Sequence, residues 1–208
     1  MAYICGKSTG VLISGKLKRM LKLYMILVGF KPEGFITEQH DIVFALGFSI
    51  ADPRINATIL KRLPIPSKTR VHIDAWVEVL HVGGYRVTVK EGSRPDSAEK
   101  LDLYFANLGG YKREDFTEHH KKLLIIASDS AEIKTVAEQD SFYREMDAIP
   151  RAQVHIDNRG RLNAEVEDEL RVSDVLDGYH LLFEPDPDGI ESLKYPIIEG
   201  YMKIGEKP

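Results

Sequence analysis

The sequence predicts an α+β protein formed by internal duplication of a β-β-α-β-β unit, with the two halves packed about a pseudo-twofold axis. Short words recur in the same order about 80 residues apart, which is the mark of a repeat. Each half has several apolar runs of strand length but only one helical pattern. Strict β-α-β alternation is absent and no Gly-rich loop follows a strand, which disfavours a doubly wound nucleotide-binding fold.

The clearest repeated word is Val-His-Ile-Asp, which occurs at Val71–Asp74 and again at Val154–Asp157. Two other pairs of similar words precede it in the same order. They are Leu23-Tyr24 with Leu103-Tyr104, each opening an apolar run, and Thr37–His40 with Thr117–His120. Three matches at nearly constant spacing indicate a duplication rather than chance.

The repeats and the composition of the segments between them predict the domain organisation. The predicted parts are an N-terminal extension outside the fold (1–19), a first repeat (20–90), a polar linker (91–100), a second repeat (101–184) and a loop-rich C-terminal tail (185–208). The extension carries its positive charges mainly after a short apolar patch, which is the reverse of a secretory signal.

The bulk composition is that of an ordinary soluble protein. Hydrophobic residues make up 43% and charged residues 29% of the chain, and the formal net charge is -4, so no broad positive field favours nucleic acid or anionic lipid. No apolar run approaches the roughly 18 residues needed to span a bilayer. The only cysteine, Cys5, lies in the extension, which excludes an intramolecular disulfide and fits a cytoplasmic protein.

In the first half, the apolar run Leu21–Val28 and the run Asp41–Leu46 are both predicted as strands. The segment Ser49–Pro53 offers two N-cap residues and a proline that a first helical turn tolerates, so a helix begins there. Period-two alternation predicts a strand from Val71, and Gly83-Gly84 predicts a hairpin turn. The partner strand of that hairpin is Tyr85–Lys90.

In the second half, Leu123–Ser128 is predicted as a strand. Asp129 and Glu132 resemble a capping box, and the apolar stripe after them predicts a helix that reaches about Met146. A further strand is predicted at Tyr179–Phe183, before the tail.

These words also resemble a bacterial family, the domain of unknown function 1543. The resemblance rests on Leu23–Phe30 with Lys31-Pro32, on Glu38–Asp41, and on His72–Trp76 with Gly84-Tyr85. It extends roughly from Met20 to Glu184 and implies a bacterial source. The domain can occur in one or two copies in that family, and the duplication corresponds to two tandem copies. The resemblance implies no activity. The second half departs from the pattern, since Trp76 has Arg159 or a neighbour as its counterpart, so a site there would be degenerate.

Five of the seven histidines fall in the repeated words, which makes those words the candidate site. On a strand, His72 and Asp74 project from one face, and His40 from the preceding word would complete a three-ligand site for a divalent metal. The candidate binding face is Glu38, His40, His72, Asp74, Trp76, Tyr85, Glu118, His120, His155 and Asp157, with His120, His155 and Asp157 as the second-half metal set. No cofactor is required by the sequence, and a divalent metal is the one it allows.

Two hypotheses for the function remain open. In the first, the chain is a non-catalytic binding or interaction protein, and the His-x-Asp pair is a solvated outer face copied by duplication. In the second, His40, His72 and Asp74 hold a metal that activates water for hydrolysis. The second requires the words of one half to meet in space. No catalytic residue is assigned. Expected partners are an unknown protein or small molecule and further copies of the chain, without nucleic acid or membrane.

Overall fold

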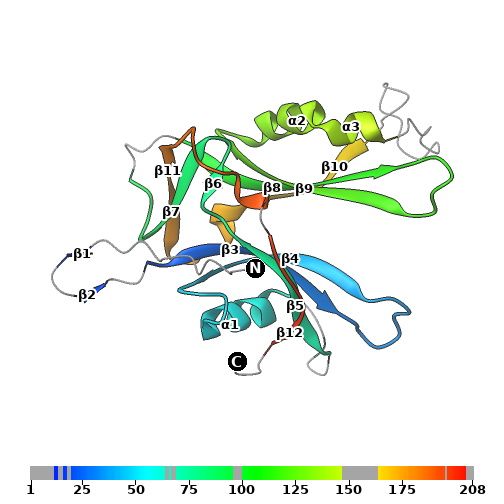
Figure 1. Ribbon diagram of the computed structural model, residues 1–208, viewed down its shortest axis with the longest axis horizontal. Helices are drawn as coiled ribbons and strands as arrows, with labels where there is room; N and C mark the ends of the chain where they lie inside the picture. Colours follow the sequence, from blue (N-terminus) through cyan, green and yellow to red (C-terminus); the bar gives the residue numbers. More distant parts are fainter. Residues whose placement is uncertain are drawn as a thin grey trace, which may run out of the picture. The chain divides into compact units, whose positions relative to one another are not determined.

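The computed structural model describes residues 12–13, 16–17, 20–63, 66, 69–95, 100–146, 164–194 and 196–204, and Figure 1 shows their helices and strands. The chain divides into two compact units. The first comprises Met1–Trp76 with Glu199–Pro208, and the second comprises Val77–Ile198. Both are rich in β-sheet and contain few helices, which is the composition of an α+β protein. None of the described helices is long and apolar enough to cross a membrane.

The first unit is a four-stranded sheet in the order β12-β5-β3-β4, with one helix, α1. The bounds are β3 Lys22–Phe30, β4 Gln39–Gly47, α1 Pro53–Arg62, β5 Val71–Glu78 and β12 Ile197–Lys203. Strands β3 and β4 form an antiparallel hairpin in which Gly29 pairs with His40. Earlier in the chain, β1 (Leu12–Ile13) and β2 (Lys16–Leu17) pair with each other.

Strand β3 lies between two neighbours, and its sequence explains why it can do so. Central strands are covered on both faces and therefore read as nearly continuous apolar runs. Tyr24, Ile26 and Val28 belong to the same buried cluster as Ile55 and Ile59 of α1. Of the alternate residues of β3, Leu23 and Met25 are buried as well, and Leu27 is partly buried.

Helix α1 begins where the sequence predicts. Asp52 is the N-cap, and its carboxylate accepts hydrogen bonds from the backbone N–H groups of Arg54 and Phe48. The Arg54 guanidinium also donates to it, at 2.7 Å from Oδ2. This hydrogen bond is the main reason why the pKa of Asp52 falls from 3.8 to about 2.

The second unit contains two three-stranded sheets, in the orders β10-β8-β9 and β11-β7-β6. Their strands are β6 His81–Val82, β7 Tyr85–Glu91, β8 Asp102–Tyr111, β9 Glu118–Ala127, β10 Ala164–Arg171 and β11 Tyr179–Pro185. The helical segments are α2 Ser130–Gln139, α3 Ser141–Glu145, η1 Val172–Val175 and η2 Ser192–Lys194. The β8–β9 hairpin pairs Gly109 with His120.

The predicted hairpin at Gly83-Gly84 is present, but its first strand is short. Both glycines have positive φ, 58° and 78°, as a two-residue hairpin turn with this twist requires. Strand β5 ends at Glu78, so β7 pairs with the short strand β6 instead of with β5 as the alternation predicted. On its other side β7 pairs with β11.

The single helix predicted to reach Met146 is wrong, because two helices occupy that segment. The break is at Asp140, whose backbone is extended and whose carboxylate caps α3 by accepting from the Phe142 N–H. The Lys121 ammonium on β9 donates to both oxygens of the same carboxylate, at 2.7 and 2.9 Å. Asp140 thus caps α3 and binds Lys121, and α2 ends just before it, at Gln139.

The sequence did not predict strands β10 and β12, nor strands β1 and β2 within the segment placed outside the fold. Strand β10 carries five charged residues among its eight, which hides its pairing with the buried strand β8. Strand β12 lies in the segment predicted to be a loop-rich tail, yet it pairs beside β5 in the first unit. It is held there partly by the hydrogen bond from the Ile204 N–H to the Val71 carbonyl.

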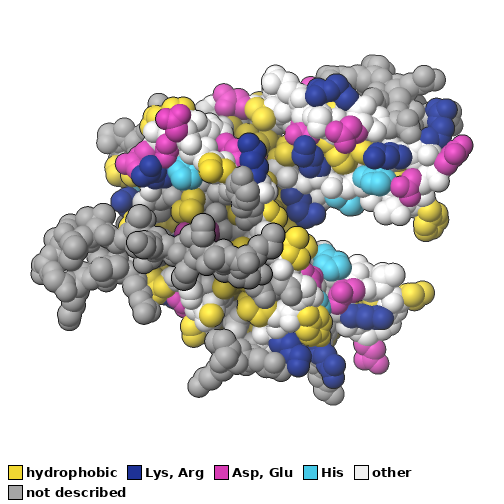
Figure 2. Space-filling view, in the orientation of Figure 1, with side chains coloured by type: hydrophobic (Ala, Val, Ile, Leu, Met, Phe, Trp, Pro, Cys, Tyr) yellow, Lys and Arg dark blue, Asp and Glu magenta, His cyan; other side chains and the backbone are white. Residues whose placement is uncertain are grey.

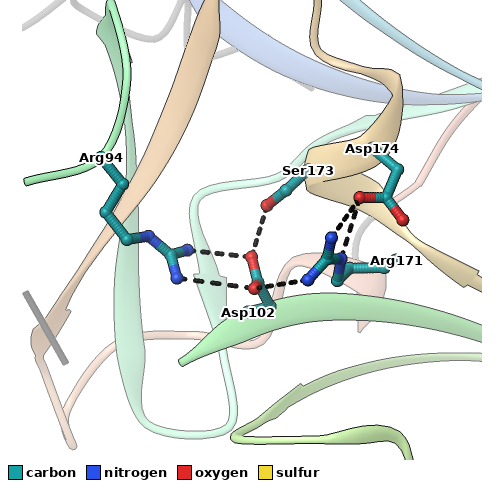
Figure 3. A network of polar contacts seen from close by, with 5 residues as sticks. All are labelled: Arg94, Asp102, Arg171, Ser173 and Asp174. Atoms are coloured by element: carbon teal, nitrogen blue, oxygen red, sulfur yellow. Dashed lines mark hydrogen bonds and ion pairs between the residues drawn. The ribbon is translucent and has the colours of Figure 1, made fainter. Parts of the chain in front are cut away.

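A polar network fastens the start of β8 within the second unit (Figure 3). Asp102 is buried, and its carboxylate accepts hydrogen bonds from the Arg94 guanidinium, at 2.9 Å, and from the Ser173 hydroxyl. Arg171 contacts the same carboxylate at 3.7 Å and is itself bound by Asp174. The network joins the linker, β8 and η1.

We predict that replacing Asp52 destabilises the protein in a pH-dependent way. A lowered folded-state pKa stabilises the fold above about pH 3.8, and this contribution is lost as the pH falls through about 2. Asp52→Ala should lower the free energy of unfolding by about 1–2 kcal/mol near neutral pH, a figure reduced because Arg54 is largely exposed. Urea unfolding at several pH values measures it. The same loss in the exposed-residue variant Asp188→Ala would contradict the prediction.

We also predict that Asp102→Ala lowers the free energy of unfolding by about 2–3 kcal/mol, somewhat less than for a fully buried ion pair because Arg171 is half exposed. The loss arises because Arg94 keeps its charge without an acceptor. Ser173→Ala removes one hydroxyl bond and should cost about 1 kcal/mol. Denaturant unfolding compares the two variants, and equal losses would show that the carboxylate is not the centre of the network.

Candidate functional site

The candidate site lies in the first unit, where three neighbouring strands bring the predicted side chains together. Glu38 directly precedes β4 and His40 is its second residue, while His72 and Asp74 lie on β5. Strand β3 separates β4 from β5, and its Gly29 is the pairing partner of His40. Glu38, His40, His72 and Asp74 are called the His–carboxylate cluster below.

The four side chains of the cluster alternate in a closed ring of contacts. Asp74 lies between the two imidazoles, with Oδ1 at 3.1 Å from His72 Nε2 and Oδ2 at 3.3 Å from His40 Nε2. Glu38 bridges the same two nitrogens, with its oxygens 3.4 Å from His72 Nε2 and 3.8 Å from His40 Nε2. Two nitrogens and two carboxylates thus face one another.

Gly29 makes this convergence possible. A Cβ atom at that position would lie 2.4 Å from His72 Nε2 and 2.6 Å from Asp74 Oδ2, distances that real side chains do not adopt. The His72 and Asp74 side chains therefore cross over the bare backbone of β3. Any other residue at position 29 would displace one of them.

The cluster is buried on one side and open on the other. The His72 side chain is only 4% exposed and that of Asp74 is 17% exposed, whereas those of His40 and Glu38 are 47% and 43% exposed. Tyr201 of β12 stacks on the His72 ring, with the ring centroids 4.1 Å apart and the planes inclined by 29°. A ligand would thus reach the cluster from the side of His40 and Glu38.

Two buried polar atoms of the cluster have no hydrogen-bond partner among the residues that the structure describes. They are His72 Nδ1 and Asp74 Oδ2. Buried polar atoms are normally paired, and each exception calls for an explanation such as an ion or a functional role. Two carboxylates around two imidazole nitrogens also need compensating positive charge, which either protons on the imidazoles or a bound cation can supply.

The excess of negative charge belongs to this cluster and not to the surface as a whole. Figure 2 shows acidic and basic side chains interspersed over the face that it displays. The chain as a whole has a formal net charge of only -4. The overall surface therefore gives little attraction to ions of one sign, and affinity for a cation would come from Glu38 and Asp74 themselves.

The other predicted residues lie elsewhere. Trp76 is buried in the hydrophobic core of the first unit, and Tyr85 begins β7 in the second unit. Glu118 and His120 lie on β9, with 3.8 Å between His120 Nε2 and Glu118 Oε2. His155 and Asp157 lie outside the described residues.

Two residues of the site were missed by the sequence analysis. Gly29 ends the apolar run that Leu23-Tyr24 opens, but nothing in the sequence indicated that side chains would cross it. Tyr201 lies far from the other site residues in sequence, in the segment predicted to be a loop-rich tail. Only the strand order, which places β12 beside β5, brings it to His72.

In the described part of the chain, no group of three or more His, Cys, Asp and Glu side chains is arranged to hold a metal ion as it stands. As it stands, the cluster is a set of ionic contacts between imidazoles and carboxylates. Its donor atoms are nevertheless those that bind transition metals, namely imidazole nitrogens and carboxylate oxygens.

We predict that Gly29→Ala destabilises the protein by about 1–3 kcal/mol, the usual result of forcing an extra methyl group into a packed site. The added Cβ would meet the His72 ring and the Asp74 carboxylate. The loss should be clearly smaller in a His72→Ala background, because one of the two obstacles is gone. Denaturant unfolding of the four proteins measures this double-mutant cycle. Equal losses in both backgrounds would contradict the crossing at Gly29.

Comparison with known proteins gives one family match and a likeness in fold. The model of the family described as Domain of Unknown Function (DUF1543) matches residues 35–89, the segment that contains the whole cluster. The crystal structure of a protein Il1583 from Idiomarina loihiensis is similar with a TM-score of 0.59 and 22% identity, over 89% of this chain and 99% of that chain. No curated protein matches the sequence. The chain therefore resembles the DUF1543 family where it carries the site, and it shares the fold of Il1583.

Proposed function

We propose that the protein is a non-catalytic binding protein whose His–carboxylate cluster binds one divalent transition-metal ion. The observation that carries this proposal is the closed ring of contacts between His40, His72 and the two carboxylates, with N–O distances from 3.1 to 3.8 Å. Imidazole and carboxylate donors in one place suit Zn²⁺ and its neighbours better than Mg²⁺ or Ca²⁺, which prefer oxygen alone.

The contacts of the ring are comparable in length with the spacing of donors around one tetrahedral ion, but each carboxylate contacts the two imidazoles through different oxygens. Both carboxylates would therefore have to turn for one oxygen of each to share an ion with the two nitrogens. Donors that lie about 2.0–2.2 Å from Zn²⁺ at tetrahedral angles are about 3.3–3.6 Å from one another. The contacts of Asp74, at 3.1 and 3.3 Å, and the shorter contact of Glu38, at 3.4 Å, are close to that range. The contact between Glu38 and His40 is longer, at 3.8 Å. Binding therefore requires the exposed Glu38 side chain to move inward, which its position in the loop before β4 allows.

A cation would also compensate the negative charge of the two carboxylates in the cluster. One divalent ion balances the two carboxylates and leaves both imidazoles neutral, which is the form that binds metal. Asp74 Oδ2, which contacts His40 Nε2 at 3.3 Å but makes no hydrogen bond within the described residues, would gain a bond to the ion. His72 would bind through Nε2 and carry its proton on Nδ1.

Glu38 distinguishes simple binding from catalysis. With Glu38 bound, four protein donors close a tetrahedral site, as in structural zinc sites. Without it, His40, His72 and Asp74 leave an open position, and Glu38 would stand beside it as a base for metal-assisted hydrolysis. The exposure of Glu38 and its longer contacts are the observations that favour this second function.

The two-repeat organisation is part of the proposal, and the hairpin registers support it. Gly29 pairs with His40 in the first hairpin, and Gly109 pairs with His120 in the second. The third strand beside each hairpin is β5 in one sheet and β10 in the other. Several features stay predictions from the sequence. They are the pseudo-twofold axis, the repeat boundaries, the bacterial source, the cytoplasmic location and the homo-oligomeric state.

Metal binding is the testable core of the proposal. Tag-free protein titrated with Zn²⁺ in a calorimeter should bind near one equivalent. Asp74→Asn keeps the shape of the side chain, and His72→Ala removes an imidazole. Because loss of a residue that merely supports a ligand weakens metal binding by roughly 10–100-fold, loss of a ligand should weaken it at least as much.

His120→Ala is the matched control, since it removes the exposed histidine that ends the matching word Thr117–His120 in the other hairpin. It should leave the affinity unchanged. Circular dichroism establishes that each variant is folded. No binding by the unmodified protein, or equal weakening by His72→Ala and His120→Ala, would exclude the cluster as the metal site. Unchanged affinity in Glu38→Gln would favour the open site and the hydrolase.

A further inference from the structure

The His72 ring is enclosed by a residue that comes from a distant part of the sequence. Only 3% of the surface of His72 is exposed, although the neighbouring His40 is largely accessible. Tyr201 lies against it with the ring centroids 4.1 Å apart. Tyr201 itself is 51% exposed, so a single aromatic ring with one face in solvent separates His72 from water on that side.

Tyr201 is held in place by the strand on which it lies. Strand β12 is an edge strand, with β5 as its one neighbour in the sheet. Met202 and Ile204 pack against the hydrophobic core of the first unit. Because side chains alternate along a strand, Tyr201 projects from the opposite face to these two anchors. Gly200, just before it, has a φ of 76°, a conformation that an L-residue adopts only with strain.

The stacked ring restricts the motion of the imidazole that Asp74 and Glu38 contact. Within the described part of the chain, His72 Nδ1 has no hydrogen-bond partner that would fix the rotation of its ring. Its orientation therefore depends on the contacts at Nε2 and on the stack with Tyr201. An edge strand with one paired neighbour is also the easiest strand of a sheet to detach.

We infer that Tyr201 is a positioning residue of the site: it fixes the His72 imidazole and, through the attachment of β12, sets how quickly a bound ion or a reagent reaches and leaves that nitrogen. The inference deepens the proposed function and rests on it for the metal-release measurement. The enclosure of His72 can be measured without any metal.

The first measurement is the rate at which diethyl pyrocarbonate modifies His72, followed by mass spectrometry of the peptide that contains it. Tyr201→Ala should accelerate the reaction roughly two- to tenfold, the range that loss of one aromatic pair allows. Tyr201→Phe keeps the stack and should react like the unmodified protein. His40 serves as the internal reference, because it is exposed in every variant.

The second measurement is the release of Zn²⁺ to an excess of chelator in a stopped-flow instrument. Tyr201→Ala should release the ion faster by a similar factor, and Tyr201→Phe should restore the original rate. Ile198→Ala, which changes a residue of β12 that is 77% exposed, controls for general loosening of the strand. Thermal unfolding shows whether each variant retains the fold.

The outcomes separate this inference from the proposed function. If the unmodified protein binds no metal but Tyr201→Ala still exposes His72, the metal proposal fails and the positioning role stands. Equal modification rates in Tyr201→Ala and the unmodified protein would overturn the positioning role, whatever the metal result. Equal effects of Tyr201→Ala and Ile198→Ala would also overturn it, because fraying of the strand would then explain both.

Discussion

The first unit depends on one steric condition, which is that two polar side chains of β5 cross the backbone of β3 at a residue without a side chain. Strand β3 must be apolar on both faces to lie between β4 and β5. Gly29 is the exception to this apolar pattern, because His72 and Asp74 occupy the space that a Cβ would fill there. The same strand pairing places His40 directly beside Gly29. The hydrophobic core and the polar cluster are therefore built on the same strand.

Much of this fold was predictable because the signals are local. The N-cap at Asp52, the capping carboxylate of Asp129 and the Gly83-Gly84 turn each follow from a few adjacent residues. The failures have equally definite causes. Asp140 separates two helices because its backbone is extended and its carboxylate caps α3, and Lys121, distant in sequence, binds the same carboxylate. The charge of β10 obscured its pairing with β8, which depends on a partner that no local pattern reveals.

The site was likewise predictable only where local sequence patterns decide its structure. The residue types of the cluster were readable from the repeated words, and alternation placed His72 and Asp74 on one side of their strand. The burial of His72 could not be predicted, because it comes from Tyr201, which lies on a strand in the segment predicted to be a loop-rich tail. Trp76, which was predicted to belong to the candidate binding face, packs in the hydrophobic core of the first unit. Long-range strand order decided both.

The first unit is discontinuous, since β12 joins it only after the whole second unit has been traversed. During synthesis on a ribosome, the residues of the cluster emerge early, long before the strand that covers His72. Contacts between segments so far apart in sequence form slowly, because a long loop must close first. Until β12 has been made, the edge of β5 that it pairs with and the His72 ring that Tyr201 stacks on lack these partners. Completion of the site therefore has to wait for the synthesis of the second unit.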